Sequence, residues 1–139
     1  MFILDTNVIS ELRRESRADA NVLSWAKGFP ANQFFLSAIT VLELQYGVLL
    51  KARKDPKQGQ LLQAWLDQQI LPHFAARILS IDEPVALRCA ALHAPDPRSD
   101  RDALIGATAL VHGMTVVTHN VSDFEGMGTS LLDPWEVRA

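Results

Sequence analysis

The sequence predicts an α/β protein, a three-layer α/β/α sandwich built around a mostly parallel central sheet of four or five strands. Two observations support this fold class. Short apolar runs typical of buried strands alternate with longer segments in which apolar residues recur at helical spacing. Because a helix separates each expected strand from the next, strands should pair in parallel through right-handed crossovers, with helices on both faces. The length of 139 residues is typical of one domain, so residues 1–139 are expected to form a single domain.

The first strand and the first two helices are expected near the N-terminus. The short apolar run from Phe2 to Leu4 is typical of a buried strand. Thr6 or Asn7 can cap a helix that continues to about Arg14. A second helix is expected over residues 19–27, where a glycine follows the last apolar position.

The middle of the chain is expected to form one strand and two long helices. The strand covers residues 33–36, the first helix begins at Ser37 or Thr40 and continues to about Arg53, and the second extends from Pro56 to about Leu71. Proline is favoured in the first turn of a helix, as at Pro56, whereas Pro72 is expected to end the second helix. The two helices between Thr40 and Leu71 are expected to form a helical arm that projects from the sheet.

The C-terminal half is expected to contribute the remaining helices and strands. They are a strand at residues 78–81, a helix capped by Asp82, a proline-rich loop at residues 94–99, a helix from Ser99 or Asp100 to Val111, a strand at residues 114–118 and a fifth strand at residues 131–133. The caps are residue types that accept hydrogen bonds from a first helical turn. Gly113 is expected to end its helix, because glycine readily adopts the left-handed conformation.

Composition limits the classes of protein to which the chain can belong. With 48% hydrophobic residues and one cysteine, Cys89, it is typical of a globular protein without an internal disulfide. No apolar run reaches the roughly 18 residues that cross a bilayer, and no cationic leader precedes an apolar segment. We therefore expect a cytoplasmic protein with no membrane partner.

The net charge of −3 does not exclude a polyanionic partner, because the basic residues are clustered. The clusters are Arg13, Arg14 and Arg17, then Lys51, Arg53, Lys54 and Lys57, and finally Arg98 and Arg101. The field near such a cluster matters more for attracting a nucleic acid than the net charge does. Each cluster, considered alone, is also typical of a solvated helix face.

Four acidic residues lie where an expected strand ends or an expected helix begins: Asp5, Glu43, Asp102 and Asp123. Ligands of open parallel sheets bind at the carboxyl ends of the strands, so these side chains are expected to converge on one edge. Carboxylates in apolar surroundings need water, a proton or a cation, and Mg²⁺ (alternatively Mn²⁺) prefers oxygen ligands of this kind. Such a site favours hydrolysis of phosphodiester bonds by metal-activated water.

Four neutral residues adjoin these acids and are expected to orient them: Thr6, Asn7, Thr118 and Asn120. Four crowded carboxylates repel one another, so some of their pKa values should be raised in the metal-free protein. The N-termini of the helices that carry Glu43 and Asp102 should offset part of this repulsion.

Each acid also has an ordinary structural explanation when it is considered alone. They can be, in chain order, a helix cap at Asp5, a solvated helix position at Glu43, a partner of the helix dipole at Asp102 and a turn residue at Asp123. Four such coincidences at matching positions are less expected than one site. Other chemistries fit less well, since the four histidines lack zinc-ligand spacing and no glycine-rich phosphate loop is present. A phosphatase with an aspartate nucleophile would carry a second aspartate two residues after Asp5, where this chain has Asn7.

The order and spacing of five segments resemble a known family. They are Phe2–Asn7, the stretch from Ser37 to Gly47 around Glu43, Asp102–Ala109, Thr118–Phe124 and Asp133-Pro134-Trp135, where relatives often carry Asn-Pro-Trp. On these segments the chain resembles the PIN domain, and more narrowly the VapC- and FitB-type toxins of bacterial type II toxin–antitoxin pairs. The resemblance spans nearly the whole chain and implies a single PIN-like domain.

The resemblance implies that the chain is a toxin and a metal-dependent endoribonuclease acting on RNA. It implies that Asp5, Glu43 and Asp102 are the core metal-binding acids and that Asp123 is a more variable fourth. It also implies a homodimer and a small antitoxin whose C-terminal segment enters the acidic groove. The N-terminal domain of that antitoxin would bind operator DNA, so the toxin would reach DNA only through the antitoxin.

An alternative function also follows from the same fold. The chain can be a catalytically weak PIN-like binding module that acts in an antitoxin–DNA autoregulatory complex. Two departures from the family pattern affect the site: His119 stands where relatives often have arginine, and Asp100 precedes Asp102 closely enough to compete for a metal. Neither departure removes a core acid.

Overall fold

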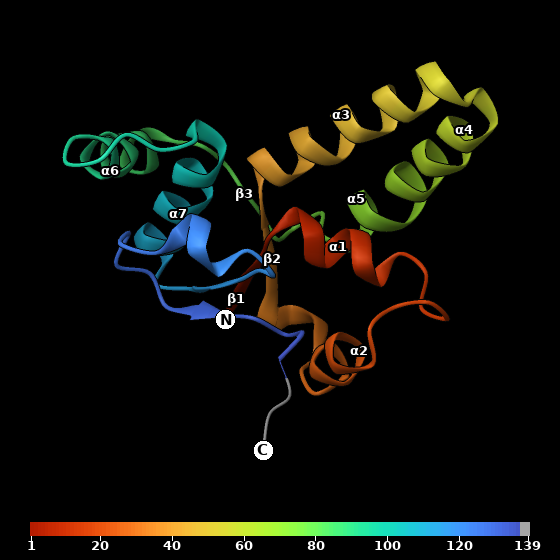
Figure 1. Cartoon of the computed structure of the whole chain (residues 1–139), viewed down its shortest axis with the longest axis horizontal. Coiled ribbons are helices and arrows are strands. Elements are labelled where there is room, and N and C mark those ends of the chain that lie inside the picture. Colours follow the sequence, from red (N-terminus) through yellow and green to blue (C-terminus); the bar gives the residue numbers. More distant parts are fainter. Residues whose placement is uncertain (137–139) are drawn as a thin grey trace.

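The central sheet has five parallel strands in the order β3-β2-β1-β4-β5 (Figure 1). The structure is a computed structural model, and it describes residues 1–136. The strands are β1 (Phe2–Leu4), β2 (Phe34–Ser37), β3 (Ile78–Leu79), β4 (Thr115–Val117) and β5 (Leu131–Leu132). The predicted fold class and parallel sheet are confirmed, and the later strands are shorter than predicted. Residues 137–139 of the predicted single domain lie outside the described residues.

Helices cover both faces of this sheet (Figure 1). They are α1 (Thr6–Leu12), α2 (Ala20–Lys27), η1 (Ala31–Gln33), α3 (Ala38–Lys54), α4 (Pro56–Trp65), η2 (Leu66–Ile70), α5 (Leu71–His73), α6 (Glu83–His93), α7 (Asp100–His112) and η3 (Val121–Phe124). Helices α6 and α7 pack together on one face, whereas α1, α2 and the α3–α5 segment lie on the other. Within residues 1–136, no helix is both long and apolar enough to cross a membrane.

The two central strands divide the core because successive side chains of a strand point to opposite faces. Ile3 and Val116 are buried against Ile105 of α7. Leu4 and Val117 are buried on the opposite face, in a cluster of apolar side chains that includes residues of α1, α3 and α4. Strands β1 and β4 are therefore apolar on both faces, as expected for the middle of a three-layer sandwich.

Side-chain caps fix where the helices begin. The prediction that Thr6 or Asn7 caps α1 is wrong, because Asp5 is the cap and its Oδ1 accepts a hydrogen bond from the Thr6 N–H at 2.9 Å. This helix ends at Leu12, not at Arg14. Of the two candidates for α3, Ser37 is the cap, and its Oγ accepts from the Ile39 N–H at 3.0 Å. The first helical turns are thus fixed by Asp5, which directly follows β1, and by Ser37, the last residue of β2.

The helix expected to end at Pro72 continues through it. After α4 the chain widens into a π-turn, η2, in which the Leu71 N–H donates to the Leu66 carbonyl, and the short helix α5 follows. Proline in a regular helix clashes with the carbonyl four residues before it, and a widened turn relieves this clash. Pro72 therefore occupies the first turn of α5, where its missing N–H is not needed.

The predicted arm is confirmed: α3 and α4 form an antiparallel pair that projects from the sheet (Figure 1). The two helices pack closely at Gly59, where a Cβ atom would lie 2.4 Å from the Ala52 Cβ. We expect Gly59→Ala to lower the free energy of unfolding by about 1–3 kcal/mol, because the two helices would have to separate. Urea denaturation followed by circular dichroism measures this change.

Gly47 provides the matched control for Gly59. It lies in the middle of α3, and an added Cβ there has no atom within 4 Å. Gly47→Ala should therefore raise the free energy of unfolding by about 0.5–1 kcal/mol, the usual gain from replacing a glycine within a helix. Equal effects of the two substitutions would show that the arm does not depend on the close approach at Gly59.

Candidate active site

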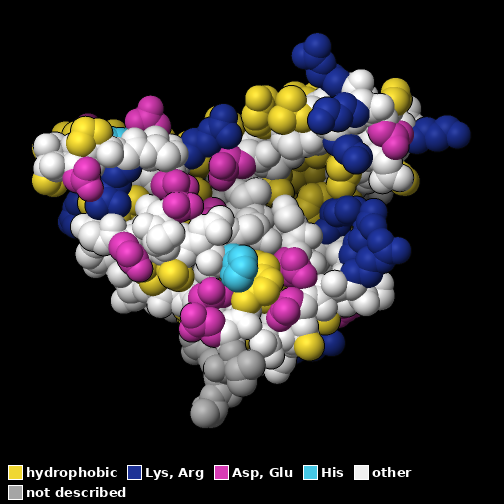
Figure 2. Space-filling view, viewed as in Figure 1, with side chains coloured by type: hydrophobic (Ala, Val, Ile, Leu, Met, Phe, Trp, Pro, Cys, Tyr) yellow, Lys and Arg dark blue, Asp and Glu magenta, His cyan; other side chains and the backbone are white. Residues whose placement is uncertain are grey.

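The four predicted acids line one open hollow of about 650 Å³. Asp5 follows β1, Glu43 is in the second turn of α3, Asp102 is in the first turn of α7 and Asp123 lies in η3. Figure 2 shows acidic side chains gathered around the middle of this face of the molecule. The structure therefore brings together the whole predicted set of acids. We call this space the acidic hollow.

The order of the strands explains why the hollow forms at this place. Strand β1 pairs with β2 on one side and with β4 on the other, so the chain connections diverge on either side of β1. Open parallel sheets leave a crevice beyond the carboxyl ends of the strands at such a switch point. Asp5 and Thr118, which follow β1 and β4 directly, lie at this crevice.

Asp5 is the most buried of the acids, with 7% of its surface exposed. Its Oδ2 accepts a hydrogen bond from the Thr118 hydroxyl at 2.8 Å, and the Asn7 Nδ2 lies 3.3 Å from the same oxygen. Burial raises the pKa of Asp5 above its ordinary value, and Glu43 and Asp123 raise it further, while the bonds from Thr118 and the Thr6 N–H lower it in part. These hydrogen bonds orient the Asp5 carboxylate, but all three of the donors are neutral groups.

Glu43 is held by one neutral donor and one cation. The Thr6 hydroxyl donates to its Oε1 at 2.8 Å, and the Arg101 Nη1 lies 3.8 Å from its Oε2. The Arg101 guanidinium also lies over the Tyr46 ring, 5.4 Å from the centroid. A protein cation therefore already stands beside one acid of the hollow.

Asp102 shows the combined effect of burial and of the neighbouring acids. Burial raises its pKa to about 6, with further contributions from the negative charges of Asp123, Asp5 and Glu43. Among the described residues, none donates a hydrogen bond to its side chain that would offset this rise. Without a cation, Asp102 is therefore mostly ionised only above about pH 6.

Three of the four residues predicted to orient the acids contact one of them directly: Thr6, Asn7 and Thr118. The fourth, Asn120, lines the hollow, and its backbone N–H donates to the Thr118 Oγ1 at 3.0 Å. Asn7 also accepts from the His119 N–H at 3.2 Å, which ties the end of β4 to the start of α1. These hydrogen bonds join the two strand ends that form the crevice.

Sequence reasoning missed other residues that line the hollow, among them Glu11 and Trp135. Glu11 lies four residues after Asn7 on α1, so helical spacing alone could have indicated it. Trp135 stacks with His119 at a ring distance of 4.3 Å, and the His119 Nδ1 lies 3.4 Å from an Asp133 oxygen. This contact depends on how β5 pairs with β4, which no local pattern reveals.

Asp100 does not line the acidic hollow. Its carboxylate lies 3.3 Å from the His93 Nε2, away from Asp102. The expectation that Asp100 competes with Asp102 for a metal therefore has no support in the geometry. His119, the other departure, does line the hollow.

The donor set of the hollow fits a divalent cation. Within residues 1–136, no three His, Cys, Asp or Glu side chains are placed so that they could hold one ion without moving. However, carboxylate oxygens are the ligands that Mg²⁺ and Mn²⁺ prefer, and two of the four acids have pKa values raised by burial and mutual repulsion. A bound cation would offset that repulsion by its positive charge.

Comparison with known proteins agrees with this geometry. The PIN domain model matches residues 2–128. VapC ribonuclease Y4jK of Sinorhizobium fredii is 38% identical over 141 residues, covering 98% of this chain and 99% of the relative. Toxin FitB of Neisseria gonorrhoeae is 38% identical over 140 residues, covering 97% of this chain and 99% of the toxin. A solved structure of FitAB bound to a DNA fragment matches with a TM-score of 0.88 at 36% identity, covering 100% of this chain and 99% of that one. These near full-length matches show that the chain belongs to the PIN-domain family.

Proposed function

We propose that the chain is the toxin of a type II toxin–antitoxin pair and that it acts as a metal-dependent endoribonuclease. The observation that carries this proposal is the convergence of four carboxylates on one open hollow at the switch point of the sheet. The names of its relatives, a VapC ribonuclease and a FitB toxin, support the same activity. The hollow is open to the surface, so a polymer can enter it without a large rearrangement.

Asp5, Glu43 and Asp102 would hold the cation, with Asp123 as a more variable fourth ligand. The ion would be Mg²⁺, with Mn²⁺ as an alternative. When bound, it would supply Lewis-acid chemistry, polarising phosphoryl oxygens and making water more acidic. The chain itself fixes the position of Asp5 through the Thr118 hydroxyl and the Thr6 N–H, and it holds Glu43 through the Thr6 hydroxyl.

The partners follow from the same proposal. The chain would bind a cognate antitoxin and would reach DNA only through it, in line with the similar FitAB–DNA structure. It would form a homodimer and a hetero-oligomer with the antitoxin, and it would act in the cytoplasm as a single PIN-like domain. The competing proposal, a catalytically weak binding module, would retain these partners but would not need a metal in the acidic hollow.

Metal dependence tests the proposed activity. We expect the purified, antitoxin-free chain to cleave a labelled structured RNA in Mg²⁺ or Mn²⁺ and to lose this activity in EDTA, because the four acids repel a phosphate unless a cation intervenes. Gel electrophoresis of the products measures cleavage, and isothermal titration calorimetry measures metal binding.

Three outcomes separate the possibilities. Cleavage that persists in EDTA after removal of bound metal would contradict the metal-dependent mechanism. Metal binding without cleavage across several RNAs would indicate a narrower substrate. Neither metal binding nor cleavage would favour the binding module instead.

A further inference from the structure

A second hollow of about 440 Å³ continues the acidic hollow toward the arm. The two spaces share Thr6, Ser10 and Glu43, so they form one continuous surface depression between α1 and α3. We call the second space the arm groove. Its far end is lined by Arg13, which follows α1, and by Lys51, in the last turn of α3.

The two cations of the arm groove are not neutralised by the protein. Within residues 1–136, the ion pairs are Lys27–Glu15, His93–Asp100, Arg101–Glu43 and His119–Asp133, so neither Arg13 nor Lys51 is within ion-pair distance of a carboxylate. Lys51 also lines an adjoining hollow with Lys54. Figure 2 shows basic side chains on both sides of a depression that hydrophobic side chains line. The depression thus changes from acidic at one end to basic at the other.

The spacing of the charges suits a strand that spans both ends. Lys51 lies eight residues after Glu43 on α3, a rise of about 12 Å along the helix axis. Arg13 lies seven residues after Thr6, about 10 Å along the other wall. An extended single strand crosses such a distance in a few nucleotides.

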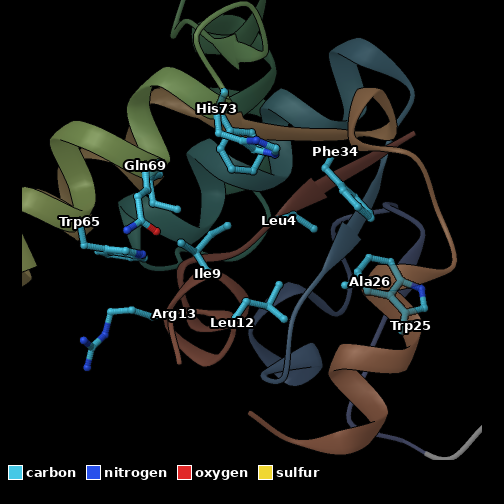
Figure 3. Close-up of a pocket in the computed structure, with 12 residues that line it drawn as sticks. Leu4, Ile9, Leu12, Arg13, Trp25, Ala26, Phe34, Trp65, Gln69 and His73 are labelled. Atoms are coloured by element: carbon cyan, nitrogen blue, oxygen red, sulfur yellow. The ribbon is translucent and has the colours of Figure 1, made fainter. Parts of the chain in front are cut away.

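The floor of the arm groove is apolar and partly aromatic. Leu44, Val48, Leu62 and Trp65 line it. Trp65 also borders a neighbouring pocket of about 270 Å³ together with Arg13, and Figure 3 shows the indole ring and the guanidinium at the same side of that pocket. Proteins that bind single strands combine a basic groove with aromatic side chains on which bases stack.

We propose that the arm groove binds the RNA strand on one side of the scissile phosphodiester, with Arg13 and Lys51 contacting backbone phosphates and Trp65 stacking on a base. This inference rests on the proposed nuclease function. RNA is favoured over a protein segment because its phosphate must enter the acidic hollow, and the next phosphates then reach two unpaired cations. A peptide would need cationic groups at one end of the depression and anionic groups at the other.

Salt-dependent binding tests the role of the cations. Fluorescence anisotropy would measure the Kd of a labelled single-stranded oligoribonucleotide of roughly 12 nucleotides for the uncleaving Asp5→Asn chain in Mg²⁺ over a range of KCl concentrations. We expect the Arg13→Ala/Lys51→Ala double variant to bind more than tenfold more weakly. The slope of log Kd against log salt should fall by about 1.4, or about 0.7 for each lost phosphate contact.

Lys27→Ala is the matched control. It removes one positive charge from α2, where Lys27 is exposed and paired with Glu15, outside both hollows. Its affinity and slope should equal those of the parent chain. An Arg13→Ala/Lys51→Ala variant whose Kd and salt slope equal those of the parent chain would overturn the proposal. If that variant binds RNA as the parent chain does but loses affinity for a cognate antitoxin, the arm groove binds a protein and not RNA.

Trp65→Leu separates stacking from charge. Trp65 is partly buried against the core, and leucine keeps an apolar side chain there. We expect RNA affinity to fall about tenfold with an unchanged salt slope, because no phosphate contact is lost. An unchanged affinity would contradict the stacking role. RNA binding in the arm groove without cleavage by the parent chain would leave this inference standing while the proposed nuclease function failed.

Discussion

Asp5→Asn is expected to abolish RNA cleavage, lowering the rate by roughly a thousandfold or more, because loss of a cation ligand forfeits several kcal/mol of transition-state stabilisation. The substituted side chain has nearly the same shape. Its carbonyl oxygen can still accept from the Thr6 N–H, as Asp5 Oδ1 does at 2.9 Å. Asparagine is also a favoured helix cap, so α1 should begin at the same residue. Single-turnover cleavage of labelled RNA measures the loss.

Asp19→Asn is the control for this prediction. Asp19 caps α2 in the same way that Asp5 caps α1, with its Oδ1 accepting from the Asn21 and Val22 N–H groups. The substitution removes the same charge without touching the acidic hollow. It should leave both cleavage and the melting temperature nearly unchanged. An Asp5→Asn chain that cleaves as fast as the Asp19→Asn chain would exclude Asp5 from the reaction.

Asp102→Asn should stabilise the metal-free protein while removing its response to metal. The pKa of Asp102 is raised to about 6 in the folded chain from an ordinary value of 3.8, so the folded state binds more protons than the unfolded state between about pH 4 and pH 6. Stability therefore falls as pH rises through this window, and the full penalty is present above it. The variant should melt a few degrees higher than the parent at pH 8 in EDTA, and the difference should vanish near pH 4.

The same variant should lose most of the stabilisation by Mg²⁺. A ligand at free concentration L that binds only the folded state raises the free energy of unfolding by RT ln(1 + L/Kd), and a missing carboxylate raises the Kd for the metal. Differential scanning fluorimetry with and without Mg²⁺ measures both effects. Asp100→Asn is the control, since Asp100 is on the same helix but lies beside His93 and outside the hollow. A difference in melting temperature between the parent and Asp102→Asn that does not grow from pH 4 to pH 8 in EDTA would contradict the raised pKa of Asp102.

Local patterns in the sequence predicted the parts of the site that lie next to strand ends. Asp5 and Thr118 directly follow short apolar strands, and the rule for parallel sheets then places them together. The sequence could not decide between Asp5, Thr6 and Asn7 as the cap of α1, because all three are acceptable caps. The roles of the acids in catalysis stay predictions until the variants are measured.

The remaining features depend on tertiary packing and had no local signal. The π-turn before Pro72 forms where the arm packs back onto the sheet, so a pattern that treats proline as a helix end could not predict it. Arg13 and Lys51 are far apart in the sequence and line the same groove only because α3 packs beside α1. Likewise, the Arg101–Glu43 pair joins α7 to α3, two helices that are far apart in the sequence.

Asp5 is both the cap of α1 and an acid of the hollow, and this affects what a mutation of its codon does. A single base change in an aspartate codon produces asparagine, and this change should inactivate the chain without unfolding it. If the chain is the toxin proposed above, cells with this change would keep making a folded, inactive chain that still binds the antitoxin. Such inactive chains would compete with intact chains for the antitoxin, so a smaller amount of intact chain in the same cell would become lethal.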